Sequence, residues 1–202
     1  MKTEFIDAIK NHQAAFELAL SDTAIDRLAA YYELVQKHNP LLHLVAPCRP
    51  EEFATRHILE SLTLLEYIPE NARFADVGTG AGLPGIPCLL VRKDLSAVLI
   101  ESKIKKAKFI VSATAQLGIS EQAEIVNRQF EEVDDSNFSM VTCRALDRFT
   151  EKLPRLVKWS GKRTLLLFGG NGLREALQKE GMLFEDRLMP LSEQRFLFIV
   201  NR

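Results

Sequence analysis

The sequence predicts an α/β fold, a doubly wound sheet with a helical amino-terminal cap, and three observations carry that prediction. The first seventy residues have apolar side chains at helical spacing, strand and helix patterns alternate from about residue 71 onward, and a glycine-rich turn follows the first strand. A chain of 202 residues with 47% hydrophobic side chains can bury one full core. We therefore expect a single domain over residues 1–202, with a cap at 1–70 and an α/β core at 71–202.

Three helices are expected in the cap. Residues 3–20 and 22–38 have apolar side chains on one helical face, and Ser21 or Asp22 can cap the second helix by accepting a backbone N–H bond. A loop punctuated by prolines then leads to Pro50, which favours the first turn of a third helix. The first seventy residues are therefore predicted to be helical.

The core is expected to alternate between strands and helices. The predicted strands lie at about 73–77, 96–101, 123–127, 138–143, 163–168 and 195–200, with a further short strand near 183–190. The predicted helices lie at about 84–92, 103–117, 147–159 and 171–180. Such alternation is typical of a sheet whose two faces are both covered by helices.

The turn Asp76-Val77-Gly78-Thr79-Gly80-Ala81-Gly82 is the strongest functional signal in the chain. Its glycines let the backbone approach a ligand, and the following helix, with Pro84 in its first turn, offers free N–H groups to a negatively charged group. A second apolar run ends in Glu101, whose carboxylate can accept hydrogen bonds from both ribose hydroxyls. Turn and acid together predict a cofactor that contains adenosine.

Two cofactors compete for this site. Gly80, Gly82 and Gly85 also form a G-x-G-x-x-G, which is typical of nicotinamide dinucleotide sites. S-adenosylmethionine (SAM) is favoured because Asp76 would attract its sulfonium and ammonium groups but would repel a pyrophosphate. Chain length also favours SAM, since a dehydrogenase usually needs a second domain. The remaining alternative is a glycine turn that only packs a helix against a strand.

Positive charge gathers in two segments although the net charge is only −1. Four lysines within residues 103–108 open the helix after Glu101. Residues 144–163 hold seven cations against two acids, and Arg148, Lys152 and Arg155 recur at helical spacing on one face. These cations predict a surface that contacts nucleic-acid phosphates beside the cofactor, or else an ordinary solvated helix face.

Composition indicates the cellular setting. The cysteines Cys48, Cys88 and Cys143 are odd in number and widely spaced, which predicts neither a disulfide framework nor a metal site and indicates a reducing cytoplasm. Charged residues interrupt the apolar amino terminus, and no run is long enough for a membrane span. We expect a cytoplasmic protein that binds neither metal nor membrane.

Longer motifs resemble a known family. They are Arg56-His57-Ile58-Leu59-Glu60-Ser61, the glycine turn with its extension Leu83-Pro84-Gly85-Ile86-Pro87, Glu101-Ser102 with Lys105-Lys106 and Phe109, and Cys143-Arg144-Ala145. Over most of its length the chain resembles the bacterial 16S ribosomal RNA guanine-N7 methyltransferases, also called glucose-inhibited division protein B. The resemblance implies a class I SAM-dependent methyltransferase fold with an antiparallel last strand and SAM as the methyl donor. It implies a guanine in 16S ribosomal RNA or the small ribosomal subunit as acceptor, and we expect a monomer.

The resemblance also assigns roles to residues. The expected cofactor contacts are Asp76, Gly78, Gly80, Gly82 and Glu101, to which we add Thr79, Leu83 and Arg128. From the distribution of positive charge, rather than from the resemblance, we expect RNA contacts at Arg56, Lys105, Lys106, Arg144, Arg148, Lys152 and Arg155. Arg144, at the mouth of the site, is also the candidate catalytic residue, and its alternative role is an ion pair with Asp147 or Glu151.

Two departures from the family pattern fall on the acceptor side. His43-Leu44-Val45 stands where the family has Asn-Leu-Thr, and Phe168-Gly169 stands where it has a Lys-Gly pair after the fifth strand. Both exchanges remove polar contacts to the base, while Phe168 adds a ring that can stack on it. The alternatives are therefore a SAM-binding ribosome-associated or regulatory module with altered or lost methyl transfer, and a methyltransferase with another RNA acceptor.

The expected reaction asks little of catalytic side chains. N7 of guanine has a free lone pair, so its attack on a sulfonium methyl needs positioning rather than deprotonation. A competing mechanism uses a cysteine nucleophile, as in cytosine-C5 methylation. Neither Pro47-Cys48 nor Pro87-Cys88 follows the fourth strand, where that mechanism needs it, and we expect Cys88 to pack in the core.

Overall fold

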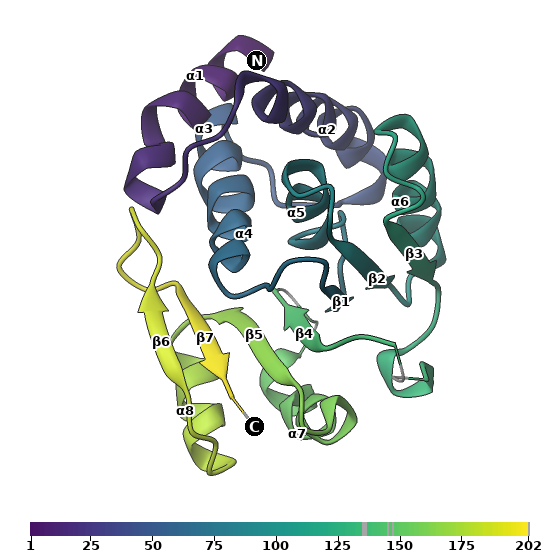
Figure 1. The fold of residues 1–202 in the computed structure, drawn as a ribbon, viewed down its shortest axis with the longest axis vertical. Coiled ribbons are helices and arrows are strands. Elements are labelled where there is room, and N and C mark those ends of the chain that lie inside the picture. Colours follow the sequence, from purple (N-terminus) through teal and green to yellow (C-terminus); the bar gives the residue numbers. More distant parts are fainter. Residues whose placement is uncertain (135–136, 145, 147, 202) are drawn as a thin grey trace.

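A seven-stranded sheet organises the part of the chain that the structure describes (Figure 1). The structure is a computed structural model that describes residues 1–201 except 135, 136, 145 and 147. The strands are β1 Arg73–Val77, β2 Ser96–Ile100, β3 Ala123–Val126, β4 Met140–Cys143, β5 Thr164–Gly169, β6 Glu185–Leu188 and β7 Phe196–Val200. Their order is β3-β2-β1-β4-β5-β7-β6. β1 to β5 are parallel, and β7 is antiparallel to both β5 and β6, which confirms the predicted fold.

The helices fall into an amino-terminal group and a group that alternates with the strands. The first group is α1 Lys2–His12, the 3-10 helix η1 Gln13–Phe16, α2 Asp22–Leu42, α3 Pro50–Glu52, the π-helical η2 Phe53–Leu59, α4 Glu60–Leu62 and the 3-10 helix η3 Thr63–Glu66. The second group is α5 Gly85–Val91, α6 Ile104–Gln116, the 3-10 helix η4 Phe130–Glu132, α7 Phe149–Ser160 and α8 Asn171–Lys179. No helix in the described ranges combines the length and apolar character needed to cross a bilayer.

The predicted elements recur within a few residues, with three differences near helix ends. The first helix stops at His12 rather than near residue 20, because the chain turns at Glu17 in a left-handed conformation (φ 59°). The second helix continues through Pro40, which lacks an N–H and so leaves out one backbone hydrogen bond of the helix. The helix ends at Leu42, and the N–H of His43 donates to the carbonyl oxygen of Asn39 at 2.9 Å. Pro84 precedes α5 rather than lying in its first turn.

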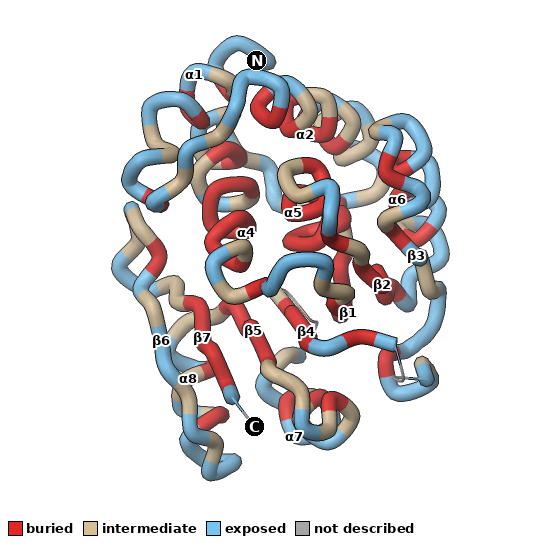
Figure 2. The backbone as a smooth tube through the Cα atoms, viewed as in Figure 1, coloured by how far each residue is buried: buried red, intermediate tan, exposed pale blue. Residues whose placement is uncertain are grey.

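Alternate residues of each central strand pack into different cores. Phe74 and Leu166 face a cluster with α2, α4 and α5, while Ala75 and Leu165 face a cluster with α7 and α8. This period of two is what a pleated strand covered on both faces requires. Figure 2 shows the result, with buried residues along β1, β4, β5 and β7 and exposed residues on the outer sides of α1 and α8.

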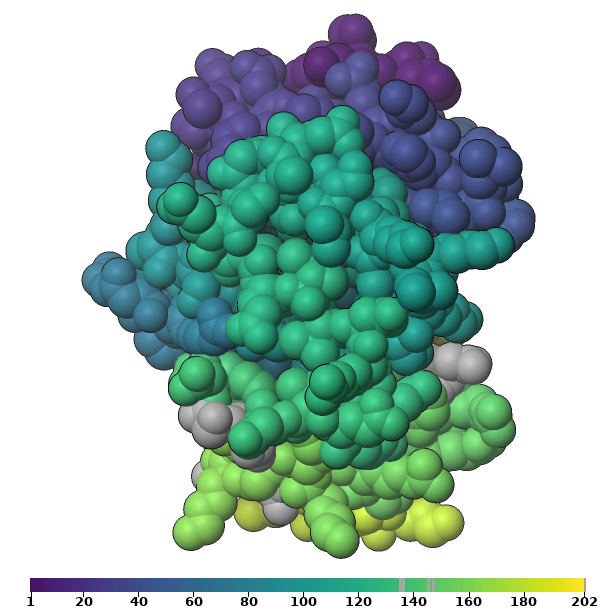
Figure 3. Space-filling model, turned by 90° about the vertical axis from the view of Figure 1, so that its right-hand side faces the viewer, coloured from purple at the N-terminus to yellow at the C-terminus, as the bar shows by residue number. Residues whose placement is uncertain are grey.

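The amino-terminal helices share the core of the sheet. One cluster of buried residues joins Phe5 and Leu28 of the first helices to Leu99 of β2 and Leu197 of β7. In the side view of Figure 3 the amino-terminal segment lies against the central part of the chain, and the carboxyl-terminal segment closes the other end. The helical cap is therefore continuous with the layer that covers one face of the sheet.

A single buried hydroxyl ties the cap to the glycine turn. Tyr31 on α2 is fully buried, and its Oη donates a hydrogen bond to the carbonyl oxygen of Ala81 at 3.0 Å. Burial raises the pKa of Tyr31 well above its ordinary value, so this phenol stays a donor at physiological pH. The position of the turn thus depends on a residue of the cap.

We predict that Tyr31→Phe destabilises the protein by about 1–3 kcal/mol, because it leaves the buried Ala81 carbonyl without its donor. Tyr32→Phe is the matched control, since Tyr32 is its buried neighbour and donates to no acceptor among the described residues. Urea unfolding of both variants checks the difference. Equal stabilities for the two variants would contradict the prediction.

Candidate active site

The glycine turn has a backbone that needs glycine. Gly78, Gly80 and Gly82 all have positive φ angles, of 67°, 60° and 95°. Residues other than glycine rarely adopt such backbone angles. A Cβ atom on Gly82 would also lie 2.3 Å from Cδ1 of Ile86. The three glycines are thus needed for the shape of the turn as well as for access to it.

A buried carboxylate holds the turn from below. Asp76 is 0% exposed, and its Oδ2 accepts a hydrogen bond from Thr79 Oγ1 at 2.6 Å and another from the Gly85 N–H at 2.8 Å. Burial raises the pKa of Asp76 to about 7, although the hydrogen bonds from Thr79 and Gly85 act in the opposite direction. Oδ1 of Asp76 is buried and has no hydrogen-bond partner among the described residues. Contact between Asp76 and a cofactor stays a prediction; in the structure the side chain binds Thr79 within the turn and Gly85 at the start of α5.

Glu101 holds the turn from the side. It follows β2 and is 6% exposed, and its Oε2 accepts a hydrogen bond from the Gly80 N–H at 3.0 Å. Its Oε1 accepts from the Lys103 N–H at 2.8 Å, where α6 begins. A carboxylate has about four acceptor sites, so Glu101 retains capacity for the hydroxyls of a ribose.

A cavity of about 270 Å³ lies against the turn. It is lined by Gly78, Thr79, Gly80, Ala81 and Leu83 of the turn, by residues of the loop between α2 and α3, and by Glu52, Arg56, His57, Lys106 and Arg144. The loop contributes Leu44, Val45, Ala46 and Cys48. The cavity is near the lower end of the volume range of small-molecule sites, and its polar groups converge from several elements.

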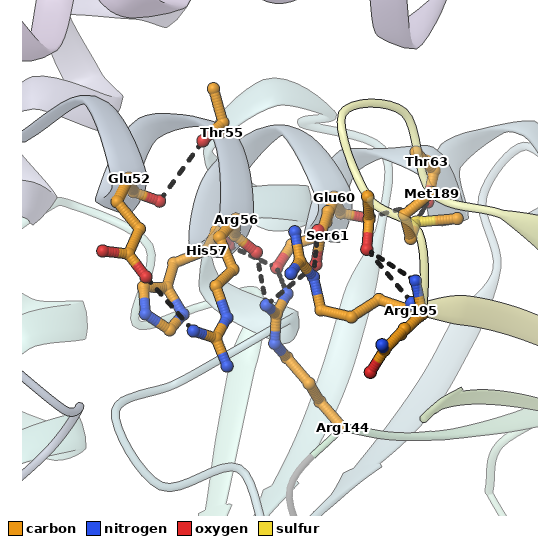
Figure 4. Close-up of polar contacts among 12 residues, drawn as sticks. Glu52, Thr55, Arg56, His57, Glu60, Ser61, Thr63, Arg144, Met189 and Arg195 are labelled. Atoms are coloured by element: carbon orange, nitrogen blue, oxygen red, sulfur yellow. Dashed lines mark hydrogen bonds and ion pairs between the residues drawn. The ribbon is translucent and has the colours of Figure 1, made fainter. Parts of the chain in front are cut away.

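Arg144 also lines this cavity and is fixed by the amino-terminal helices (Figure 4). It is only 11% exposed, and its guanidinium donates to Glu60 Oε2 at 3.2 Å, to Ser61 Oγ at 3.1 Å and to the carbonyl oxygen of Arg56. The alternative expectation of an ion pair with Glu151 is wrong, because Glu151 contacts Arg148 instead, and Asp147 lies outside the described residues. Arg144 is thus oriented before any substrate arrives.

Two further groups complete the acceptor side. The Phe168 ring lies 5.4 Å from the guanidinium carbon of Arg144 and is 5% exposed, so it supports Arg144 and has little open face for a base. Burial and the neighbouring arginines lower the pKa of His57 to about 3, so its imidazole is neutral. The Nδ1 atom of His57 is buried and has no hydrogen-bond partner in the described part of the chain.

The other sequence candidates divide into two groups. Thr79, Leu83, Arg56 and Lys106 line the cavity, and burial lowers the pKa of the half-buried Lys106. Arg128, Lys105, Arg148 and Arg155 are exposed, Lys152 is half-buried, and none of the five lines the cavity. His43 is likewise exposed and lies outside it, whereas its neighbours Leu44 and Val45 line it.

The predicted basic stripe is less regular than its spacing suggested. The helix begins at Phe149, and Arg148 precedes it with left-handed angles (φ 52°), so Arg148 does not continue the helical face of Lys152 and Arg155. Arg148 lies 3.7 Å from Glu151, and Arg155 lies 3.9 Å from Glu131. Exposed pairs of this kind are worth little, so these arginines can exchange their partners for phosphates.

The described cysteines are poor nucleophiles. Cys88 and Cys143 are fully buried, and burial raises the pKa of each thiol far above its ordinary value. Cys48 lines the cavity, but burial raises its pKa as well. A thiolate is the reactive form, so all three positions disfavour covalent catalysis. Within the described residues, no three His, Cys, Asp or Glu side chains come together as a metal site.

Sequence patterns did not reveal two functional contacts. Arg195 donates from Nε to Glu60 Oε1 at 2.7 Å, although the two residues lie 135 positions apart. Tyr31 reaches Ala81 from a helix whose periodicity indicates only core packing. No local pattern in the sequence indicates a polar partner for Arg195, which precedes the last strand, or for Tyr31, which lies on an apolar helix face. Their partners become close only in the folded chain.

The raised pKa of Asp76 predicts a stability that falls with pH. Its carboxyl group keeps its proton up to about pH 7 in the folded protein, whereas the unfolded chain loses it near pH 4. The folded state therefore binds the extra proton between these values, so this group's stabilisation is present below pH 4 and is lost as pH rises to 7. Asp76→Asn should remove this dependence, and the stability difference between wild type and variant should change by a few kcal/mol over the interval. Urea unfolding at pH 4 to 7 measures it, and parallel curves would refute it.

Comparisons with known proteins give the family. The family described as rRNA small subunit methyltransferase G (GidB) matches residues 24–192. The ribosomal RNA small subunit methyltransferase G of Neisseria meningitidis serogroup C / serotype 2a (strain FAM18) is 39% identical over 157 residues, which are 78% of this chain and 72% of that protein. The protein of the same name from Nitrosospira multiformis is 39% identical over 144 residues, 71% of this chain and 64% of that protein.

Solved structures agree on the fold. The M1A22 tRNA methyltransferase TrmK of B. subtilis is 18% identical, with a TM-score of 0.55 over 70% of this chain and 64% of that one. The ribosomal protein L11 methylase of Lactobacillus delbrueckii subsp. bulgaricus is also 18% identical, with a TM-score of 0.58 over 73% of this chain and 79% of that one. At such identities the likeness shows the class I methyltransferase fold alone. Together with the family match, it means that the chain belongs to the rRNA small subunit methyltransferase G family.

Proposed function

We propose that the protein transfers a methyl group from SAM to N7 of a guanine in 16S ribosomal RNA, as a cytoplasmic monomer that acts on the RNA or the small ribosomal subunit. The observation that carries the proposal is one cavity lined by the glycine turn, here called the first wall, and by Glu52, Arg56, His57 and Arg144, here called the second wall. The second wall carries two arginines and one carboxylate. Membership of the family supplies the class of acceptor.

The residues of the first wall fit SAM. Gly78 and Gly80 line the cavity without placing a side chain in it, and Glu101 stands at the end of β2 with acceptor capacity for ribose hydroxyls. When bound, SAM supplies an electrophilic methyl group on a positively charged sulfur. The Glu101 side chain beside the turn favours such a cation over a pyrophosphate.

The second wall fits a guanine that is positioned rather than activated. N7 of guanine carries a free lone pair, so the protein needs no general base and gains rate mainly by alignment. Arg144 is held by Glu60 and Ser61 and can contact the O6 edge or a phosphate. The neutral His57 lines the same cavity and can donate or accept a hydrogen bond at the base edge.

We also propose that residues 1–70 and 71–202 act as one functional domain. The same hydrophobic cluster contains residues of both parts, and Tyr31 of the first part bonds the glycine turn of the second. Arg144 of the second part is held by Glu60 of the first. Both walls of the cavity therefore need the helical cap.

A second candidate function is SAM binding without methyl transfer. The observation that favours it is Phe168, which stands where the family pattern has lysine and whose ring lies beneath Arg144. An ammonium at this position would add a donor for the base or a phosphate, and the phenyl ring does not replace it. A protein that binds SAM and ribosomal RNA but leaves the RNA unmodified would fit this alternative.

The deciding experiment incubates the protein with isotopically labelled SAM and with 16S RNA transcribed in vitro, either free or reconstituted into small subunits. Nucleoside mass spectrometry should detect 7-methylguanosine. 5-Methylcytidine would instead indicate a cysteine nucleophile, and SAM binding without any modified nucleoside would favour the second candidate. Sedimentation of the protein alone tests whether it is a monomer.

We predict that Glu101→Ala weakens SAM binding by about 1–3 kcal/mol, or about 5- to 150-fold, because it removes acceptors for the ribose and for the Gly80 N–H. Glu124→Ala is the matched control, since Glu124 lies on β3, is exposed and does not line the cavity. Titration calorimetry measures both affinities. Unchanged SAM affinity in Glu101→Ala would contradict the assignment of the ribose to this residue.

We predict that Arg148→Ala and Lys152→Ala weaken RNA binding and lower its log–log salt slope by about 0.7–0.9 for each lost phosphate contact, while SAM affinity is unchanged. Arg144→Ala should reduce turnover more than RNA affinity, because it lines the cavity. Lys93→Ala is the control, since Lys93 is exposed between α5 and β2, at the opposite end of the parallel strands. Wild-type salt slopes in both stripe variants would mean that the RNA surface lies elsewhere, first at Lys105 and Lys106.

A further inference from the structure

A second hollow opens beside the cofactor cavity, next to β5 and β7. It measures about 260 Å³, and its wall includes Arg56, Arg144 and Arg195 together with Phe168 and Phe196. Arg56, His57 and Arg144 line both hollows, so the two adjoin at these side chains. A substrate group in the second hollow would therefore lie next to the cofactor cavity.

Cations outnumber anions around this second hollow. Three arginines line it with one carboxylate, Glu60, which is 2% exposed and binds both Arg144 and Arg195 (Figure 4). Arg56 is 44% exposed and pairs with the equally exposed Glu52 at 3.2 Å, an interaction that water screens. The depressed pKa of the His57 imidazole, which burial and these three arginines cause, reflects the excess of positive charge. The hollow is therefore suited to an anion.

Arg195 is the cation best placed to bind that anion. Its Nε donates to Glu60 Oε1 at 2.7 Å, which fixes the direction of the guanidinium, and 39% of its side chain remains exposed. It also lines an adjacent hollow of about 430 Å³ with Arg49 and Arg56, whose wall includes the carboxylates Glu51 and Glu52. Arg56 and Arg195 line both this hollow and the second one, so these two cations lie along a path from one hollow to the other.

We propose that Arg195, with Arg56, binds a backbone phosphate of the RNA next to the target nucleotide, and that Glu60 positions Arg195 for this contact. The proposal rests on the proposed function, since it names the phosphate contacts of the same reaction. A guanidinium is a planar, bidentate donor for phosphate oxygens, and a carboxylate behind it restricts its rotamers. The contact involves no covalent step.

The test compares Arg195→Gln and Arg195→Lys with the control Arg187→Gln. Arg187 belongs to β6 of the same hairpin but pairs with Glu17 and Glu66 and lines neither hollow. Each protein is titrated with a 16S RNA fragment that contains the methylated guanine, and the phosphates near that guanine are replaced singly by neutral methylphosphonates. Wild type should lose about tenfold or more in affinity at one position. Arg195→Gln should be weaker on the natural RNA, insensitive to that replacement, and lower in salt slope by about 0.7–0.9.

Unchanged SAM affinity in Arg195→Gln is expected, because Arg195 does not line the cofactor cavity. Arg195→Lys keeps the charge and should retain the salt slope with a weaker response to the methylphosphonate, which tests the proposal even if Arg195→Gln fails to fold. The proposal is overturned if the Arg195 variants keep the wild-type slope and the wild-type response at every phosphate. Failure of the proposed function would look different, because wild type itself would then leave the RNA unmethylated, whether or not it binds it.

Discussion

The geometry of the site depends on two carboxylates that fix a backbone which glycine alone leaves free. Gly78, Gly80 and Gly82 can adopt positive φ angles, but they can adopt many other angles as well. Glycine loses more conformational entropy on folding than other residues, so further contacts must hold the turn in this one conformation. Asp76 binds Thr79 within the turn and Gly85 at the start of α5, and Glu101 binds Gly80 of the turn. Because both acids are nearly or fully buried, their bonds act at low dielectric and oppose the flexibility of the glycines. Glu101, beside the turn, also suits a cofactor with a positively charged sulfur.

The helical cap builds the acceptor side of that turn. Tyr31 bonds Ala81 on the turn, and Glu60 and Ser61 hold Arg144 at the end of β4. Truncating Glu60 would leave Arg144 and Arg195 with no carboxylate between them, and a charge stranded at low dielectric costs more than the lost bond. This dependence explains why a sheet that already holds the cofactor turn is joined to helices that contribute no strand.

The sequence predicted the sheet and the cofactor turn because both depend on local patterns. Period-two burial marks strands such as β1 and β5, and glycine spacing marks a turn whatever lies around it. The pairing of Glu60 with Arg195 was not predictable, because no local pattern joins residues 135 positions apart. The break between Arg148 and the following helix was missed for a related reason, since helical spacing counts residues and does not detect a left-handed φ at the first of them. Loop residues such as Leu44 and Cys48 line the cavity because α2 continues past Pro40 to Leu42, so that the loop after it begins next to the cavity.

The exchange of lysine for Phe168 changes how the acceptor side is charged. A lysine there would face Arg144 as a like charge, and its ammonium would have to bind a substrate anion or Glu60. With Phe168 the guanidinium of Arg144 lies over an aromatic ring instead, and Glu60 is free to bind Arg195 on its other oxygen. The hollow beside the end of β5 thus takes its positive charge from Arg56, Arg144 and Arg195. Phe168 contributes an aromatic ring beneath the Arg144 guanidinium rather than a further charge.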